Sequence, residues 1–171
     1  MYYVLQLQRR VQIEPRLFNR NIEQTIIQKL INDVEGKFAG GNGFVVAVIN
    51  LVHGVPSGQL DDGTGFAIFP VTYNAIVYRP FKNEVVDAIV SRVTQHGFFA
   101  EAGPLTIFVS HHLIPEDMAY QSMPEGFVST DQGETITRDT KVRLKIIGLK
   151  IEVTDISATG SMRDDYLGVN E

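Results

Sequence analysis

The chain has 171 residues, of which 44% are hydrophobic and 20% charged, and it contains no cysteine. This length allows one domain or two small ones, and the composition is typical of a folded globular protein. The missing cysteine excludes disulfides, thiol catalysis and cysteine-ligated zinc. No apolar run reaches the roughly 18 residues of a membrane helix, and residues 1–10 show no secretory signal. We therefore expect an intracellular protein without membrane contact.

The net charge of −5 is unevenly distributed along the chain. Residues 1–82 carry 8 Lys and Arg against 6 Asp and Glu, a net +2, whereas residues 83–171 carry 7 against 14, a net −7. Nonspecific binding of nucleic acid relies on clustered cations. The acidic second half is therefore excluded as a region that binds RNA by overall electrostatic attraction. Any RNA contact there must come from a local patch and from stacking on rings.

The first elements in chain order are a strand and an amphipathic helix. Residues 2–11 mix aromatic and aliphatic side chains, which favours a strand. Apolar residues then recur at helical spacing and predict a helix over residues 21–35, with Gly36 as a suitable terminator. The apolar face of this helix is Ile22, Ile26, Leu30 and Val34. We expect this face to pack against the protein's own sheet.

Three apolar segments and one long loop follow the helix. Strands are predicted over residues 44–49, 66–69 and 71–78, with Pro70 at the margin where proline is tolerated. Between the first two strands, residues 53–65 are rich in Gly and Pro and longer than a tight hairpin requires. This segment predicts an exposed loop.

The second half predicts a small β-barrel. The charge balance changes sign near Pro80, which suggests two domains, residues 1–80 and residues 81–171. Five strands in roughly 85 residues, with turns between them, favour a five-stranded barrel such as the OB fold. The expected strands cover residues 85–90, 97–101, 105–109, 142–148 and 155–160. Residues 115–118 predict one helical turn, and residues 122–133 a polar, turn-rich connection. The fold class expected for the whole chain is α+β.

No pattern of residues predicts catalysis or metal binding. His111 and His112 are adjacent, and neighbours on a strand point to opposite faces, so they are poorly placed to share one ion. Asp164 and Asp165 are interpreted as a solvated tail. The segment 40–43 lacks the Lys-Ser/Thr ending of a phosphate loop and predicts a turn. We expect no metal, no cofactor, no small-molecule substrate and no enzymatic activity.

A different kind of surface is indicated by the clustered rings of the second half. These side chains are His96, Phe98, Phe99 and Phe108. Phe98 and Phe99 must face opposite sides of their strand, so one can fill the barrel while the other is exposed. Exposed rings on a curved β-surface bind single-stranded nucleic acid by stacking, and Arg143 and Lys145 alternate on one face where they could contact phosphate. The alternative is that both phenylalanines are buried, one under a neighbouring domain.

Three segments carry a resemblance that covers essentially the whole chain. Residues 73–87, Tyr-Asn-Ala-Ile-Val-Tyr-Arg-Pro-Phe-Lys-Asn-Glu-Val-Val-Asp, resemble the inter-domain signature of the family of the seventh-largest subunit of eukaryotic RNA polymerase II, a family with archaeal relatives. Residues 34–45 resemble that family's turn between first helix and strand. Residues 160–168, Gly-Ser-Met-Arg-Asp-Asp-Tyr-Leu-Gly, are similar to its polymerase II tail.

The resemblance implies a fold and a function. It implies an N-terminal ribonucleoprotein-like tip domain, an antiparallel sheet plus helix, followed by a C-terminal OB-fold barrel of the ribosomal "S-one" type. Members are nuclear, non-catalytic stalk subunits. They pair with the fourth-largest polymerase II subunit, dock on the core subunits near the RNA exit channel, support initiation and contact nascent single-stranded RNA.

The resemblance also assigns residues. It implies stacking positions at His96, Phe99 and Phe108, with Phe98 in the core. It places the polymerase-docking loop at His53, Gly54, Val55, Pro56, Asp61, Asp62 and Gly63. Residues 150–154 lack the Asp and Arg that such barrels often add, which predicts weak RNA binding. Two alternatives stay open: a purely structural interaction module without RNA binding, and the stalk subunit of another nuclear polymerase.

Overall fold

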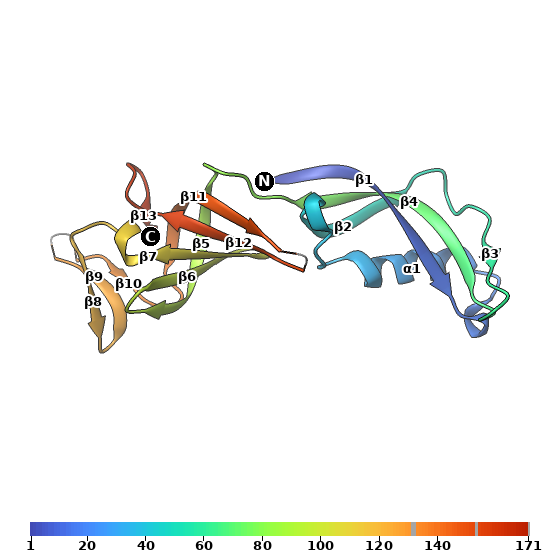
Figure 1. Ribbon diagram of the computed structural model, residues 1–171, viewed down its shortest axis with the longest axis horizontal. Coiled ribbons are helices and arrows are strands. Elements are labelled where there is room, and N and C mark those ends of the chain that lie inside the picture. The colour runs from blue at the N-terminus through green and yellow to red at the C-terminus, as the bar shows by residue number, and fades with distance from the viewer. Residues whose placement is uncertain (131–132, 153, 171) are drawn as a thin grey trace. The chain divides into compact units, whose positions relative to one another are not determined.

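The computed structural model describes residues 1–130, 133–152 and 154–170 (Figure 1). Residues 131, 132 and 153, which belong to two of the segments interpreted above, lie outside the described part. The chain forms two compact units: one is Tyr2–Arg79, and the other comprises Pro80–Glu171 together with Met1. Each unit has its own core.

The N-terminal unit is an antiparallel sheet with one helix packed on it. Its strands are β1 (Tyr2–Ile13), β2 (Phe44–Leu51), β3 (Gln59–Leu60) and β4 (Ala67–Tyr78). The central strand β4 pairs with β1 on one side, and with β2 and β3 on the other. The helix α1 (Ile22–Val34) covers one face of this sheet (Figure 1).

The predicted helix is confirmed, and its apolar face forms the core of the unit. Ile26, Leu30 and Val34 are buried, in one cluster with the inward side chains of β1, β2 and β4. Gly36 follows the helix with a φ of 71°, a left-handed conformation that glycine adopts without steric cost. Its amide donates to the carbonyl of Val45 at 2.8 Å, which turns the chain back toward β2.

The prediction of two strands separated at Pro70 is wrong, because β4 runs through this residue. Pro70 lies opposite Arg10 of β1. On the other side of β4, the pairing with β2 ends at Tyr73 and that with β3 begins at Ile68. The Thr72 carbonyl accepts from the Val52 amide at 2.8 Å, so the backbone groups of Thr72 point to this second side. The ring nitrogen of Pro70, two residues earlier, points the same way. The missing N–H therefore costs no ladder bond.

The C-terminal unit is the predicted five-stranded barrel. Its strands are β5 (Val85–Thr94), β6 (Gly97–Ala102), β7 (Leu105–Ser110), β11 (Lys141–Ile151) and β12 (Ile156–Ser161). They pair in the order β12-β7-β6-β5-β11, and β11 also pairs with β12, which closes the barrel. Phe98, Leu105, Ile107, Leu144 and Ile146 fill the interior. The placement of Phe98 in the core is confirmed.

The connections of the barrel differ from the sequence-based expectation. A three-stranded sheet stands between β7 and β11: β8 (Met118–Ser122), β9 (Glu125–Ser129) and β10 (Thr135–Ile136). Residues 122–133, predicted as a connection, thus include a strand. Residues 115–118 form a turn and no helix; the 3₁₀ helix η3 (His111–Leu113) comes just before it.

The chain also continues past the strand predicted as its last. β13 (Gly168–Val169) pairs with β11. Two further 3₁₀ turns, η1 (Pro15–Leu17) and η2 (Gly40–Asn42), flank α1. Within the described residues, none of the helices is both long and apolar enough to span a bilayer.

Candidate nucleic-acid interface

Two phenylalanine rings lie side by side on the outer surface of the barrel. Phe99 of β6 is directly opposite Phe108 of β7, and their ring centroids are 4.9 Å apart at an interplanar angle of 45°. Both side chains are half-buried, whereas Phe98, Ile107 and Val109 beside them point inward and are buried. The alternation of the two strands thus separates a core row from an outer aromatic pair.

A cation extends this pair onto a third strand. The guanidinium carbon of Arg92 lies 4.9 Å from the ring centroid of Phe99, a distance suited to a cation–π interaction. Arg92 faces outward because β5 contains a bulge: Val90 pairs with Ala100, but Arg92 pairs with Phe99. We call Arg92, Phe99 and Phe108 the ring platform.

Sequence reasoning missed Arg92, because strict alternation places it on the same face as buried Ala88 and Val90. The one hint in the sequence is the spacing of the apolar residues Val90 and Val93, which lie three residues apart. Both point into the barrel because the bulge lies between them.

His96 directly precedes β6, the strand that carries Phe99. It is exposed in the turn between β5 and β6, and its Nε2 lies 3.2 Å from Nε2 of Gln95. Its carbonyl accepts a hydrogen bond from the amide of His111 at 3.0 Å. Of the predicted RNA-binding residues, the structure thus brings Phe99 and Phe108 into contact and places His96 three residues before Phe99 in the chain.

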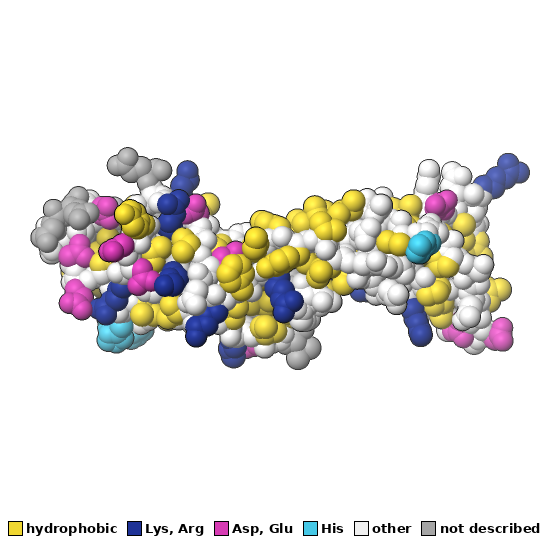
Figure 2. Space-filling model, turned by 90° about the horizontal axis from the view of Figure 1, so that it is seen from above, with side chains coloured by type: hydrophobic (Ala, Val, Ile, Leu, Met, Phe, Trp, Pro, Cys, Tyr) yellow, Lys and Arg dark blue, Asp and Glu magenta, His cyan; other side chains and the backbone are white. Residues whose placement is uncertain are grey.

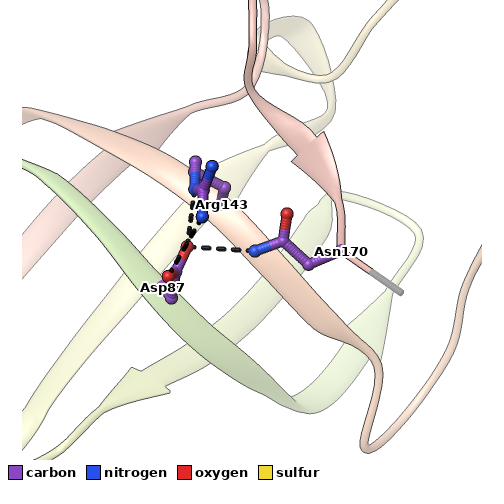
Figure 3. A network of polar contacts seen from close by, with 3 residues as sticks. All are labelled: Asp87, Arg143 and Asn170. Carbon is purple, nitrogen blue, oxygen red and sulfur yellow. Dashed lines mark hydrogen bonds and ion pairs between the residues drawn. The ribbon is translucent and has the colours of Figure 1, made fainter.

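Arg143 and Lys145 are placed elsewhere, on β11. This strand is separated from the β6–β7 ring pair by β5 on one side of the barrel and by β12 on the other. Arg143 donates to both carboxylate oxygens of Asp87 at 2.7 and 3.3 Å, and Asn170 donates to the same carboxylate at 3.0 Å (Figure 3). Lys145 is paired with Asp164 at 2.7 Å. A phosphate would compete with these carboxylates.

The network in Figure 3 also affects the acidity of Asp87. The hydrogen bonds from Arg143 lower the pKa of the Asp87 carboxyl; partial desolvation opposes this, and the charge of Arg143 and the bond from Asn170 add to the lowering. The network ties the C-terminal strand β13 to β5 and β11, a structural role.

The predicted docking loop is largely exposed, as expected, but it is partly ordered by its own contacts. It contains the short strand β3, which the sequence did not indicate. Asp61 holds a turn: its carboxylate accepts from the Thr64 hydroxyl at 2.6 Å, and its carbonyl accepts from the Gly65 amide at 2.7 Å. Val55 packs against the core. His53, Gly54, Pro56, Asp62 and Gly63 are exposed.

Exposed apolar side chains near this loop were missed by sequence reasoning. Leu60 on β3 is 67% exposed, and Leu17 and Phe18 are exposed in the connection between β1 and α1. The Pro15 ring lies 3.7 Å from the point where a Cβ would stand on Gly65, so the two segments adjoin. In the sequence, the exposure of these apolar residues is indicated only by their position outside the segments with helical or strand periodicity.

The N-terminal sheet has a second apolar surface on the face away from α1. Tyr2, Val4, Val46 and Ile49 are exposed there, and the Tyr2 and Tyr78 rings lie 5.1 Å apart. Val4 pairs with Ile76 in the β1–β4 ladder. Figure 2 looks onto this face and shows hydrophobic side chains gathered on it. Large exposed apolar patches of this kind mark interaction sites.

His111 and His112 are not strand neighbours, as assumed above, but lie in η3 with ring centroids 3.6 Å apart. Even so, across residues 1–130, 133–152 and 154–170, no group of three His, Asp or Glu side chains is arranged to hold a metal ion.

Comparison with known proteins assigns each unit to a domain type. Residues 8–65 match the SHS2 domain found in the N terminus of Rpb7p/Rpc25p/MJ0397, and residues 79–159 match the S1 RNA binding domain. The fold and the matches define a two-domain protein that joins an SHS2 domain to an OB barrel of the S1 type. Both the predicted fold class and the predicted resemblance are confirmed.

Full-length relatives identify the family. The chain is 47% identical over 171 residues to DNA-directed RNA polymerase II subunit RPB7 of Glycine max, covering 99% of this chain and 96% of that protein. It is 34% identical to the RPB7 of Saccharomyces cerevisiae, covering 98% and 99%. DNA-directed RNA polymerase V subunit 7 of Arabidopsis thaliana is 29% identical over 151 residues, 86% and 84% of the two chains. The chain belongs to the RNA polymerase II subunit 7 family.

Proposed function

We propose that the chain is a non-catalytic stalk subunit of RNA polymerase II that contacts nascent RNA through the ring platform. Relatives named as polymerase II subunits match at 34–47% identity, above the 29% of the polymerase V subunit. This difference favours polymerase II over another nuclear polymerase. The proposal implies a nuclear location. It assigns no catalysis to the chain, because the sequence offers no carboxylate cluster of the kind that metal-assisted nucleotidyl transfer uses.

The observation that carries the RNA function is the ring platform on an S1-type barrel. Two adjacent half-exposed rings provide a surface on which a base can stack, worth roughly 1–3 kcal/mol per base. Arg92 adds a cation within reach of a neighbouring phosphate, and His96 adds a further ring. Because few cations surround the platform in this acidic half of the chain, the binding is expected to be weak and largely independent of sequence.

Arg143 and Lys145 keep a proposed but secondary role. Each must leave its carboxylate before it can bind phosphate, so its contribution is smaller than that of Arg92. Exchanging one charged partner for another in solvent changes little free energy.

The N-terminal unit is proposed as the docking unit. The apolar sheet face formed by Tyr2, Val4, Val46 and Ile49 is suited to pairing with the fourth-largest polymerase II subunit. The loop of residues 53–65, with Leu17 and Phe18 beside it, is suited to insertion between the core subunits. An exposed loop held by its own turns can enter a crevice without a large ordering cost.

A salt titration separates this function from the purely structural alternative. The full chain, free and with its partner, is titrated against fluorescently labelled oligouridylate at several salt concentrations. The proposal predicts weak binding whose logarithm falls linearly with the logarithm of salt concentration. Lack of binding at low salt, for the chain alone and for the pair, would support the structural module instead.

A further inference from the structure

We propose that His111 and His112, together with His96, form a second position of the RNA face, one that binds phosphate and makes RNA affinity rise as the pH falls. This inference rests on the proposed RNA function of the ring platform. It adds a phosphate-binding position and a dependence of the RNA affinity on pH. Stacking on phenylalanine supplies neither, since phenylalanine carries no ionisable group.

The three histidines come from two segments that a backbone hydrogen bond holds against each other. The His111 amide donates to the His96 carbonyl at 3.0 Å, which fixes η3 against the turn between β5 and β6. Within η3, the His111 and His112 rings lie with their centroids 3.6 Å apart at 42°. All three side chains are exposed. Figure 2 shows histidine side chains gathered at one margin of the C-terminal unit.

This cluster continues the ring platform along the same two strands. In the β6–β7 ladder, Phe99 pairs with Phe108, and Gly97 pairs with Ser110, two residues further on. His96 and His111 directly follow this last pair. The histidines therefore begin roughly 10 Å along the strands from the phenylalanine pair, given the rise per residue of a strand. An RNA base on the platform leaves its neighbouring phosphate free to reach the imidazoles.

Protonation and phosphate binding are coupled at such a pair. A phosphate anion attracts an imidazolium ring more strongly than a neutral imidazole. Histidine changes its charge between pH 5 and pH 8. Since phosphate favours the protonated rings, RNA binding takes up protons. By linkage, affinity then increases as the pH falls through this range and decreases as it rises.

The charged groups around the cluster do not reverse this effect. On β6 the one charged residue is Glu101, opposite Thr106 at the far end of the strand, and β7 carries none. Past η3, the Glu116 carboxylate is paired with Arg163 at 2.9 Å. The Asp117 carboxylate accepts from the Ser129 hydroxyl at 2.8 Å.

A tail segment and a cation also lie near the cluster. Met162 donates its amide to the carbonyl of Leu113, which places the tail and Arg163 next to η3. On β5, Arg92 lies over Phe99 and stays charged throughout the range. Its contribution to RNA binding is therefore independent of pH.

The test measures the RNA affinity of the full chain at about pH 5.5 and about pH 7.5 at constant ionic strength, using labelled oligouridylate. We expect the wild-type affinity to be roughly 3- to 10-fold higher at the lower pH, the range that exposed ion pairs supply. In H111Q/H112Q the ratio of the affinity at the lower pH to that at the higher pH should fall to less than half of its wild-type value. His53→Gln, which replaces a histidine of the other unit, is the matched control and should keep the full ratio.

The outcomes distinguish this inference from the proposed function. If H111Q/H112Q is folded and keeps the wild-type pH ratio, the histidine position is overturned while stacking stands. If F99A/F108A binds as wild type but H111Q/H112Q loses the pH ratio, the platform fails and the histidine position stands. Lack of RNA binding at both pH values overturns both. As a second readout, RNA should shift the His111 and His112 ring-proton resonances toward the imidazolium values in NMR spectra, and unmoved resonances would contradict the inference.

Discussion

Phe99 and Phe108 form a cross-strand pair on the outside of the barrel, while Phe98, the immediate neighbour of Phe99, is completely buried inside it. One pair of adjacent residues thus serves the core and the surface. The outer pair lies in register with Arg92, so three neighbouring strands contribute to one platform. Loss of the outer rings is expected to affect binding without emptying the core.

The first prediction concerns these rings. F99A/F108A should weaken binding of single-stranded RNA by about 10-fold or more, since each stacked base is worth roughly 1–3 kcal/mol. Fluorescence titration measures the affinity, and circular dichroism confirms the fold. Tyr166→Ala removes an aromatic ring that is 95% exposed in the tail and should leave the affinity unchanged. A folded double variant with wild-type affinity would rule out this RNA face.

The second prediction separates the two groups of cations. Arg92→Gln should weaken RNA binding and reduce the slope of log affinity against log salt by about one, the value of one phosphate contact. Arg143→Gln, whose guanidinium is paired with Asp87, should change the slope less. A larger effect at Arg143 than at Arg92 would move the RNA path from the ring platform to β11.

The third prediction concerns the glycine between the rings and the histidines. Gly97 has a φ of 142°, and a Cβ there would lie 2.1 Å from the carbonyl oxygen of Val109. Gly97→Ala should therefore lower the free energy of unfolding of the barrel by roughly 1–3 kcal/mol, measured by urea unfolding. Gly148→Ala in β11, where the nearest atom is 4.0 Å away, is the control and should cost less. Equal stability of the two variants would contradict the geometry at Gly97.

The fourth prediction follows from the lowered pKa of Asp87. A carboxyl whose pKa is lower in the folded state stabilises the fold above its unfolded pKa and loses this effect as the pH falls. The free energy of unfolding of the wild type should therefore exceed that of Asp87→Asn by a constant amount near neutral pH. This difference should shrink below about pH 4. The difference should be small, since both Asp87 and Arg143 are exposed to solvent. A difference that grew as the pH fell would contradict this assignment.

Elements governed by local periodicity could be predicted from the sequence. The helix, its terminator Gly36 and the barrel strands depend on neighbours in the chain. Alternation placed Phe98 and Phe99 on opposite faces, and the resemblance assigned Phe98 to the core. What could not be predicted depends on pairing between distant segments. The bulge that turns Arg92 outward, the continuous strand through Pro70 and the carboxylates that hold Arg143 and Lys145 all require knowledge of which strand lies opposite.

Residues outside regular periodicity were also poorly predicted. The docking loop was expected to be exposed, but its strand β3 and the turn held by Asp61 arise from contacts with β4 and within the loop. Leu60 and Leu17 stand out only once the fold shows that both side chains stay exposed. Exposure is a property of the three-dimensional arrangement and not of the local sequence.

Affinity purification of the tagged full chain from its own cells, followed by mass spectrometry, tests the central claim most directly. We predict recovery of the fourth-largest subunit together with the largest polymerase II subunits. L17D/L60D should reduce recovery of the largest subunits while retaining the fourth, because it places charges on the proposed docking loop and on the adjoining segment between β1 and α1, and leaves the sheet face intact. Recovery of another polymerase would contradict the assignment to polymerase II, and recovery of no polymerase subunit would contradict the stalk function itself.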